Sequence, residues 1–200
     1  MKRIFDVVVS FSGLVFFSPI FLLAALLIKA GSPGPIFYRG VRVGLGGKPF
    51  RIYKFRTMVI DAEKKGASST HESDDRITGI GGFLRRLKLD ELPQLINVLC
   101  GDMSLVGPRP EVQKFVDMYT SEEQIILTVR PGITDWASIR FHNEGEIIAA
   151  SGIADSDAAY AKLIRPEKLR FQIKYARERT FWTDVGILFE TVAMLVRTRI

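Results

Sequence analysis

The sequence predicts an α+β protein that is mainly helical: an N-terminal re-entrant membrane helix broken at a Ser-Pro pair, a small β-hairpin, and a helical domain with interfacial helices at the membrane surface. Three observations lead to this fold class. A long apolar run opens the chain, two segments of alternating apolar and basic residues flank a glycine-rich turn, and apolar residues recur at helical spacing in the C-terminal half. We expect residues 1–30 to form the anchor and residues 31–200 to form one integrated domain.

Positive charge is concentrated beside the apolar run. Residues 1–60 hold nine Lys and Arg residues and one acid, Asp6, for a net charge of +8, whereas residues 61–200 hold nineteen and twenty-one, for a net charge of −2. This distribution favours an anionic membrane surface or a phosphate-rich ligand and argues against a nucleic-acid-binding protein. The single cysteine, Cys100, excludes an intramolecular disulfide and is expected to be a small core residue.

The apolar run covers residues 4–28 and contains one charge, Asp6. A straight helix of this length would extend ~37 Å, enough to cross a bilayer core of ~30 Å. Ser18-Pro19 lies near its middle, where a proline removes a helix hydrogen bond, and cations flank both ends, so no inside/outside bias is evident. We therefore expect a helix that breaks at Ser18-Pro19 and returns to the same cytoplasmic face, with Ser18 bonded to a carbonyl freed by the break. A spanning helix is the alternative.

A β-hairpin is predicted to follow the anchor. Residues 36–39 and 50–56 alternate large apolar and basic side chains, and residues 44–49 between them are rich in glycine. These glycines do not fit a phosphate-binding loop, because Arg42 stands where the first glycine is required and Pro49 replaces the Ser or Thr. The segment is therefore interpreted as a turn.

The remaining segments predict loops, a strand and helices. In chain order they are a polar surface loop over 61–76 in which His71 has no role, helices over 79–86 and 111–128, a strand over 136–141, an acidic loop over 144–157, and helices over 158–179 and 183–199. The ends of the last two helices and the segment between them carry side chains suited to a membrane interface: Arg177, Arg179, Phe181, Trp182, Arg197 and Arg199. An ordinary amphipathic helix that covers a core fits the same pattern.

The stretch over residues 89–110, LDELPQLINVLCGDMSLVGPRP, has the strongest functional signal. It begins with two adjacent carboxylates, Asp90 and Glu91, continues as a short apolar helix and ends in a Gly-Pro-Arg-Pro turn. One interpretation is a plain helix start with Asp90 as the N-cap. The other is a site that handles phosphate, in which an acid, a cation and a rigid turn are brought together.

The chemistry of such a site follows from its residue types. Two adjacent carboxylates in a dry site require a cation, so a hard divalent metal is expected. Mg²⁺ on Glu91 would neutralise a diphosphate and leave Asp90 free to attack phosphorus as a carboxylate nucleophile. Phosphate oxygens would be met by basic residues, for which the candidates are Arg39, Arg42, Lys54, Arg56, Arg85, Arg109 and Arg130. A re-entrant anchor would hold this chemistry at the bilayer surface, so a lipid substrate is expected.

Six short motifs occur in one order along residues 1–140. They are Lys2-Arg3-Ile4-Phe5-Asp6, Ser18-Pro19, Tyr53-Lys54-Phe55-Arg56-Thr57-Met58, Leu89-Asp90-Glu91-Leu92-Pro93-Gln94-Leu95, Gly101-Asp102-Met103-Ser104-Leu105-Val106-Gly107-Pro108-Arg109-Pro110 and Val129-Arg130-Pro131-Gly132-Ile133-Thr134. In content and order the chain resembles the bacterial sugar transferases and, more narrowly, the small monotopic polyprenyl-phosphate phosphoglycosyl transferases.

The resemblance implies an activity and a location. Such enzymes move a sugar-1-phosphate from a UDP-sugar to undecaprenyl phosphate and release UMP, the first membrane step in the assembly of a capsule, exopolysaccharide, O-antigen or glycoprotein glycan. It also implies an Mg²⁺-dependent, ping-pong reaction at the cytoplasmic face of the bacterial inner membrane, with UDP-sugar, undecaprenyl phosphate and membrane lipid as partners and no nucleic acid. A homodimer within the bilayer is left open.

The resemblance also implies roles for individual residues. The acid that corresponds to Asp90 is the nucleophile and forms a covalent phosphosugar intermediate, and the one that corresponds to Glu91 holds Mg²⁺. The helix break at Ser18-Pro19 makes the anchor re-entrant. Residues near the phosphates correspond to Lys54, Arg85 and Arg109.

The chain departs from the family pattern after Thr134. Family members commonly continue Gly-Trp/Leu-Ala-Gln-Val-Asn-Gly-Arg, whereas here Asp135 replaces the glycine and the Asn-Gly-Arg is missing. His142 stands where the arginine would be, so it is a candidate donor contact, although a surface histidine without a role fits equally. The chain also begins without the spanning helices that larger members place in front, which predicts a minimal catalytic unit. A non-catalytic membrane scaffold is the alternative, and the intact Asp90-Glu91 pair argues against it.

Overall fold

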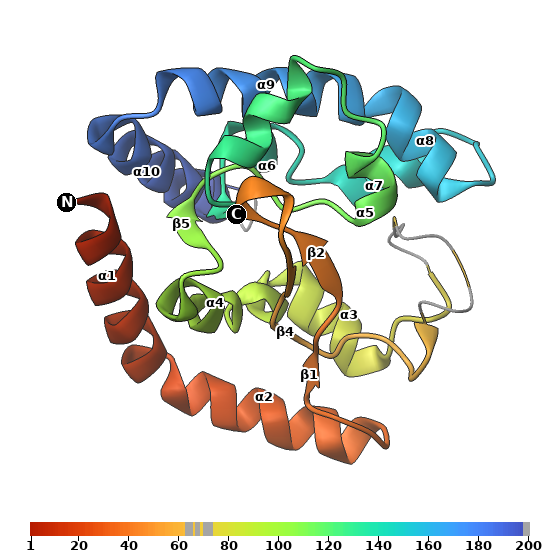
Figure 1. Ribbon diagram of the computed structural model, residues 1–200. Coiled ribbons are helices and arrows are strands. Elements are labelled where there is room, and N and C mark those ends of the chain that lie inside the picture. The colour runs from red at the N-terminus through yellow and green to blue at the C-terminus, as the bar shows by residue number, and fades with distance from the viewer. Residues whose placement is uncertain (63–65, 67–68, 70–73, 198–200) are drawn as a thin grey trace.

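The computed structural model describes residues 1–62, 66, 69 and 74–197. Within these residues the protein is mainly helical and has three two-stranded sheets (Figure 1). In chain order the elements are α1 (Lys2–Phe16), α2 (Ser18–Gly31), β1 (Phe37–Tyr38), β2 (Val41–Val43), η1 (Leu45–Gly47), β3 (Pro49–Arg51), β4 (Lys54–Phe55), α3 (Gly79–Arg86), η3 (Leu89–Glu91), α4 (Gln94–Cys100), β5 (Ser104–Val106), α5 (Gln113–Val116), η4 (Glu123–Thr128), β6 (Gly132–Thr134), α6 (Trp136–Arg140), α7 (Glu144–Ala150), α8 (Ser156–Leu163), α9 (Arg165–Glu178) and α10 (Phe181–Arg197).

The N-terminal apolar run forms two helices that meet at Phe17. α1 and α2 are bent by 60° at this break. In the described parts of the chain no single helix is long and apolar enough to cross a membrane, whereas α1 and α2 together are, by length and composition. The break follows from Pro19, which has no N–H to donate. The Ser18 hydroxyl instead donates to the Val15 carbonyl at 2.8 Å, as the sequence predicted.

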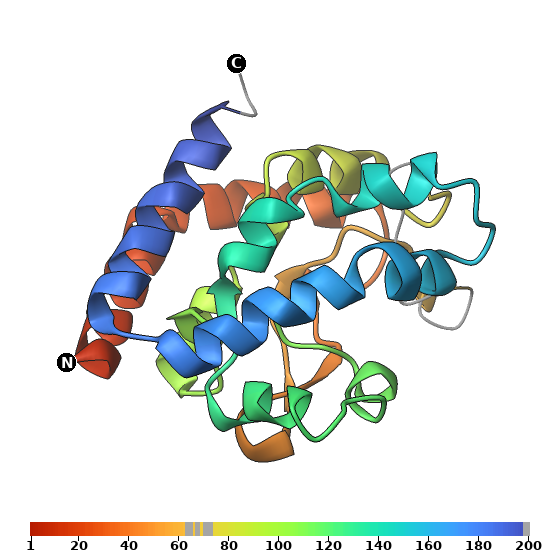
Figure 2. The same cartoon turned by 90° about the horizontal axis from the view of Figure 1, so that it is seen from above.

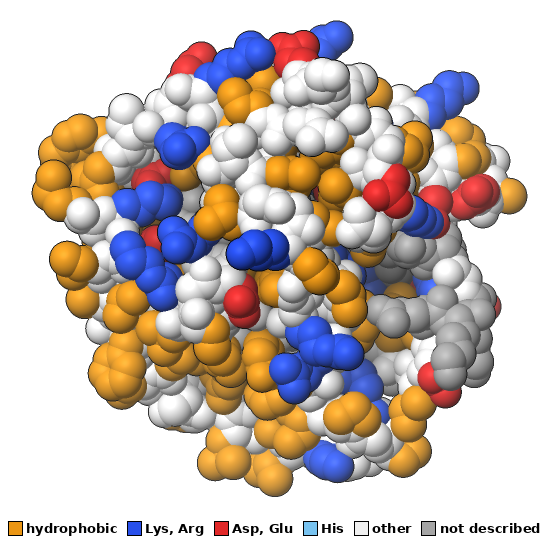
Figure 3. Space-filling model, in the orientation of Figure 1, with side chains coloured by type: hydrophobic (Ala, Val, Ile, Leu, Met, Phe, Trp, Pro, Cys, Tyr) orange, Lys and Arg blue, Asp and Glu red, His pale blue; other side chains and the backbone are white. Residues whose placement is uncertain are grey.

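Large apolar side chains are exposed along this helix pair. Figure 3 shows hydrophobic side chains gathered along the lower and left edge of the molecule, where Figure 1 places α1 and α2. Exposed members of this surface are Ile4, Val8, Phe11, Val15, Phe16, Leu22, Leu23 and Leu26, and α10 adds Trp182, Phe189, Val192 and Val196. Exposed apolar surface on this scale is typical of a face that contacts a membrane or a partner.

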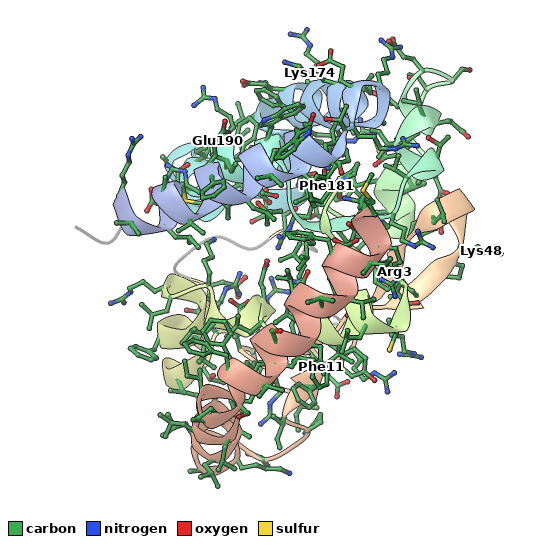
Figure 4. All side chains as sticks on the ribbon, turned by 90° about the vertical axis from the view of Figure 1, so that its left-hand side faces the viewer. Arg3, Phe11, Lys48, Lys174, Phe181 and Glu190 are labelled. Atoms are coloured by element: carbon green, nitrogen blue, oxygen red, sulfur yellow. The ribbon has the colours of Figure 1, made fainter. Side chains whose placement is uncertain are left out.

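The charged residues at the start of α1 attach this helix to the rest of the protein. Lys2 pairs with Asp184 of α10 at 2.5 Å, and Arg3 donates to the Val98 carbonyl near the end of α4 at 2.6 Å. The buried Asp6 accepts from the Ser104 hydroxyl at 2.8 Å. Figure 4 shows Phe181 at the start of α10 beside the Arg3 end of α1. The N-terminal basic pair is therefore bound by protein groups, which fixes the anchor against α4, β5 and α10.

The predicted hairpin is present but is interrupted. β2 pairs with β3 through Val41 and Arg51, and β1 pairs with β4 through Phe37 and Phe55, both antiparallel. Between the two sheets, the buried Asn97 of α4 accepts from the Tyr53 N–H at 2.8 Å and donates to the Arg51 carbonyl at 2.8 Å. Asn97 thus joins α4 to the hairpin directly before Lys54.

A short parallel sheet supports the second half of the site. β5 and β6 pair through Ser104 with Gly132 and through Val106 with Thr134. The chain beyond β5 also lies against β6, because Gly132 donates to the Pro108 carbonyl at 2.9 Å. A Cβ on Gly132 would stand 2.0 Å from the Gly107 nitrogen, so only glycine permits this approach. This close approach of Gly107 to Gly132 fixes the position of the loop that carries Arg109.

Several sequence predictions are wrong in their boundaries or type. The expected strand over 136–141 is helix α6, because the Asp135 side chain accepts from the Ser138 N–H at 2.6 Å and caps it. The expected loop over 144–157 contains α7 and the start of α8. The expected helix over 158–179 is two helices, which separate at Ile164 just before Arg165-Pro166, since a proline belongs in a first turn.

Three further predictions also need correction or lie outside the description. The expected helix over 111–128 is reduced to α5 and the 3₁₀ helix η4. Cys100 is exposed and is not a core residue, because it is the last residue of α4. His71 and Arg199 lie outside the described residues.

Candidate active site

The two carboxylates lie in a 3₁₀ turn between α3 and α4. Asp90 and Glu91 belong to η3, and Lys88 directly before it has the left-handed conformation, with φ 55° and ψ 19°. This conformation is uncommon for a residue with a Cβ and occurs often at functional sites. α4 begins later, at Gln94, and its N-cap position is Pro93 without a side-chain cap. The interpretation of Asp90 as the N-cap of this helix is therefore wrong.

Glu91 is held by two cations. Lys54 of β4 donates to its Oε1 at 2.9 Å, and Arg109 donates to its Oε2 at 2.9 Å and also to its Oε1. Burial alone would raise the pKa of Glu91, but Arg109 and Lys54 hold it well below its usual value. Burial lowers the pKa of Lys54, and Glu91 opposes this shift. Glu91 is therefore ionised, and it connects the hairpin to the Arg109 loop.

Asp90 has a different environment. Its side chain is buried, at 8% exposure, and it has no hydrogen-bond or ion-pair partner among the described residues. Burial raises the pKa of Asp90 above its usual value and the Glu91 carboxylate adds to this, whereas Lys54, Arg85 and Lys88 act in the opposite direction. A buried carboxylate without a partner costs stability and is a recognised feature of functional sites.

Two further basic residues face the acid pair. Arg85, in the last turn of α3, is half-buried, acts electrostatically on Asp90, and has no ion-pair partner within the described chain. Lys88 donates to the His142 carbonyl at 3.2 Å, so the segment after α6 lies beside the acid pair. His142 itself is half-buried, and its Nδ1 lies 3.2 Å from the Ile139 carbonyl.

The other four predicted phosphate ligands have different surroundings. Arg39 lies over the Tyr53 ring, 4.6 Å from its centre, and Arg42 donates to the Val41 carbonyl at 2.8 Å. The buried Arg56 donates to the Ser32 carbonyl at 2.8 Å, to the Ser32 hydroxyl at 2.9 Å and to the Pro33 carbonyl, which holds the exit from α2. Arg130 is exposed and its Nε donates to the Gly101 carbonyl at 3.1 Å. None of these four residues forms an ion pair with Asp90 or Glu91 within the described chain. Of the predicted cations, the structure brings Lys54, Arg85 and Arg109 to the acid pair.

The donor set limits how a metal could be held. No group of three or more His, Cys, Asp or Glu side chains in the described chain could ligate a metal ion. Mg²⁺ is commonly bound by one or two carboxylates together with water and substrate phosphates. The acid pair of Asp90 and Glu91 fits this way of binding Mg²⁺, in which a bound diphosphate would supply the remaining ligands. The pair does not form a metal site made of protein groups alone.

A second group of residues lies behind the site and was not predicted from the sequence. Lys168 and Gln172 of α9 are buried; Lys168 contacts Glu111 and Glu144, and Gln172 contacts Arg109. Their positions carried no signal, because one long helix was expected there and a lysine in a helix is usually exposed. The left-handed backbone of Lys88 was also not predicted, because such a conformation at a lysine has no sequence signature.

The arrangement defines a class of protein. Among the described residues, a buried carboxylate without a partner lies beside a carboxylate held by Lys54 and Arg109, and Arg85, which has no ion-pair partner among them either, acts electrostatically on the buried carboxylate. Such a set of groups can bind a phosphate ester and attack it. The bent apolar helix pair of the same chain carries an exposed apolar face. Together these features make the acid pair a candidate phosphate-handling site in a chain with a large apolar surface.

Comparison with known proteins gives the family. The sequence matches the family described as bacterial sugar transferase over residues 1–198. It is 39% identical over 199 residues to UDP-N-acetylgalactosamine-undecaprenyl-phosphate N-acetylgalactosaminephosphotransferase of Aeromonas hydrophila. The matched residues make up 98% of this chain and 44% of that protein. The chain belongs to the bacterial sugar transferase family.

Two relatives named for a different sugar match equally well. The UDP-glucose:undecaprenyl-phosphate glucose-1-phosphate transferase of Escherichia coli K12 is 38% identical over 96% of this chain and 39% of its own length. The protein of the same name from Caulobacter vibrioides is 39% identical over 98% of this chain and 70% of its own length. The chain spans less than half of the length of the Aeromonas and Escherichia proteins.

Proposed function

We propose that this chain transfers a sugar-1-phosphate from a UDP-sugar to undecaprenyl phosphate and releases UMP. One observation carries the proposal: Asp90 is a buried carboxylate with no partner in the part of the chain that the structure describes, and it lies next to the Glu91 carboxylate that Lys54 and Arg109 hold. The names of the relatives support the two substrates. They differ in the sugar, so the donor sugar is left open as N-acetylgalactosamine, glucose or another hexose.

The proposed reaction has two displacements at phosphorus. An Asp90 carboxylate oxygen attacks the phosphorus bonded to the sugar; the bond from this phosphorus to the bridging oxygen breaks, and UMP leaves with that oxygen and its electron pair. An oxygen of the lipid phosphate then attacks the same phosphorus, and the Asp90 carboxylate leaves. Each step breaks one P–O bond and forms one, which gives ping-pong kinetics.

The basic residues and a metal ion are proposed to neutralise the negative charge of the donor diphosphate together. Lys54 and Arg109, which meet at Glu91, are proposed to face the diphosphate, and Arg85 to face the phosphate that Asp90 attacks. Glu91 would hold Mg²⁺, which supplies charge neutralisation when bound. His142 lies across Lys88 from the acid pair and is proposed as a contact of the donor. Arg56 and Arg130 would have to exchange their protein partners to reach a phosphate.

The apolar helix pair is proposed to place this site at a bilayer. A 60° bend between α1 and α2 suits a helix that enters and leaves by one face, the cytoplasmic face of the inner membrane, where a UDP-sugar is available. The lipid phosphate of the acceptor would lie at the same surface. A homodimer within the membrane stays a prediction.

The topology can be tested by cysteine labelling in sealed inverted vesicles. In a Cys100→Ser background, a cysteine inserted between Met1 and Lys2 and the Gly31→Cys variant are expected to react with the same membrane-impermeant reagent from the same side. The physical reason is that both ends of the bent pair return to one surface. Labelling of the two cysteines from opposite sides would contradict the re-entrant arrangement and support a spanning one.

The activity can be tested with a panel of UDP-sugars. Purified protein in lipid nanodiscs with undecaprenyl phosphate and Mg²⁺ is expected to release UMP from at least one of UDP-N-acetylgalactosamine, UDP-glucose, UDP-N-acetylglucosamine and UDP-galactose. Chelation by EDTA is expected to stop the release, and excess Mg²⁺ to restore it, because a divalent cation held by Glu91 would neutralise the charge of the diphosphate. UDP or free sugar as the product would instead indicate glycosyl transfer or hydrolysis.

A further inference from the structure

One face of α9 lies along the loop that carries Arg109. Lys168 contacts Glu111 at 3.4 Å, Gln172 donates to the Arg109 carbonyl at 3.4 Å, and the Tyr175 hydroxyl donates to the Val106 carbonyl at 2.9 Å. Residues spaced by four and three positions share a helix face. The loop from 106 to 111 therefore runs antiparallel to α9, which crosses the middle of the molecule between α8 and α10 in Figure 2.

Lys168 also reaches the segment on the other side of the site. Its Nζ lies 3.5 Å from Glu144 Oε2 and 4.8 Å from the centre of the Tyr160 ring, and the Tyr160 hydroxyl donates to Glu111. Glu144 begins α7, two residues after His142, whose carbonyl binds Lys88. Lys168 is thus the point at which the Arg109 loop and the His142 segment meet.

We propose that Lys168 is a positioning residue for the donor side of the active site: by pairing with Glu111 and Glu144 it holds the Arg109 loop and the His142–Glu144 segment at a fixed separation. The role rests on the proposed function. Lys168 is 5% exposed, and two carboxylates surround a single ammonium. Removing this charge would leave the Glu111 and Glu144 carboxylates facing each other without a cation between them.

The two carboxylates keep Lys168 charged. Burial alone would lower the pKa of Lys168, but Glu111 and Glu144 raise it well above its usual value, so the ammonium persists through the neutral range. Burial also raises the pKa of the neighbouring Tyr119 and Tyr160, so both phenols stay neutral.

Lys168→Met is expected to lower the rate of UMP release about tenfold or more, because the two carboxylates lose the cation that lies between them and repel each other. Adding Glu144→Gln to Lys168→Met is expected to recover much of the activity, because the amide removes the repulsion. Lys162→Met, an exposed lysine of α8, is the matched control and is expected to behave as the wild type.

The outcomes separate this role from the proposed function. No loss of activity in Lys168→Met, or no recovery in the double variant, would overturn the positioning role. Thermal unfolding of each variant identifies a general loss of fold; a loss of activity that follows a fall in Tm would assign Lys168 a purely structural role and would overturn the positioning role as well. A wild-type protein that releases no UMP from any donor would overturn the proposed function, and this role with it.

Discussion

Asp90→Asn protein is expected to release no measurable UMP from a UDP-sugar, a loss on the order of 10⁴-fold or more. The change removes the one buried carboxylate that has no hydrogen-bond or ion-pair partner among the described residues, and a neutral amide cannot form the covalent bond to phosphorus. Asp117→Asn is the control, because that aspartate is exposed on the surface and accepts only from Gln113. Turnover of Asp90→Asn near the wild-type rate would eliminate Asp90 as the nucleophile.

The same substitution is expected to stabilise the protein. The raised pKa of Asp90 means that the folded state binds its proton more tightly than the unfolded state, so ionised Asp90 lowers the free energy of unfolding at neutral pH. This cost is absent below the usual carboxyl pKa of 3.8. It grows as pH rises from there to the pKa of Asp90 in the folded protein. With EDTA present, Asp90→Asn should therefore have a higher Tm at pH 7 than the wild type. A lower Tm would mean that the carboxylate is stabilised in the fold.

Gly132→Ala is expected to have the largest effect on stability and to remove activity as well. Its Cβ would lie 2.0 Å from the Gly107 nitrogen and 2.6 Å from the Gly107 Cα, which are backbone atoms that cannot rotate away. Relief of this overlap would separate the chain before Arg109 from β6 and break the bond from Gly132 to Pro108. The expected cost is about 3 kcal/mol or more, measured as a fall in Tm in nanodiscs.

Gly186→Ala is the matched control for this substitution. Gly186 lies inside α10, and a Cβ there would meet nothing within 4 Å. Alanine favours a helix over glycine by about 0.5–1 kcal/mol, so its Tm should stay the same or rise. If Gly132→Ala and Gly186→Ala gave the same Tm, the close approach of the Arg109 loop to β6 would not be needed for the fold.

The parts of the fold that local chemistry determines could be predicted from the sequence. Pro19 breaks the apolar run because it lacks an N–H, and the Ser18 hydroxyl binds the freed carbonyl. The alternating side chains around residues 44–49 do form a hairpin. Asp90 and Glu91 could be identified as candidate site residues, because two adjacent acids directly after a basic run are typical of a charged site.

The parts that long-range contacts determine could not be predicted. The different environments of Asp90 and Glu91 depend on Lys54 and Arg109. These two residues lie 37 and 18 positions from Glu91 in the sequence, and both form their ion pair with Glu91. Residues 136–141 look like a strand by composition, but a side-chain cap from Asp135 makes them a helix. A buried lysine such as Lys168 is recognised only when the two acids that surround it are seen in space.

Intact-protein mass spectrometry of the enzyme with a UDP-sugar and Mg²⁺, in the absence of undecaprenyl phosphate, tests the central claim most directly. A covalent aspartyl intermediate requires a gain in mass of one sugar phosphate, the release of about one UMP per protein, and a modified peptide that contains Asp90. The adduct should disappear when the lipid phosphate is added and should be absent in Asp90→Asn. UMP release that occurs only when both substrates are present, with no adduct on the protein, would contradict the account and indicate direct transfer to the lipid.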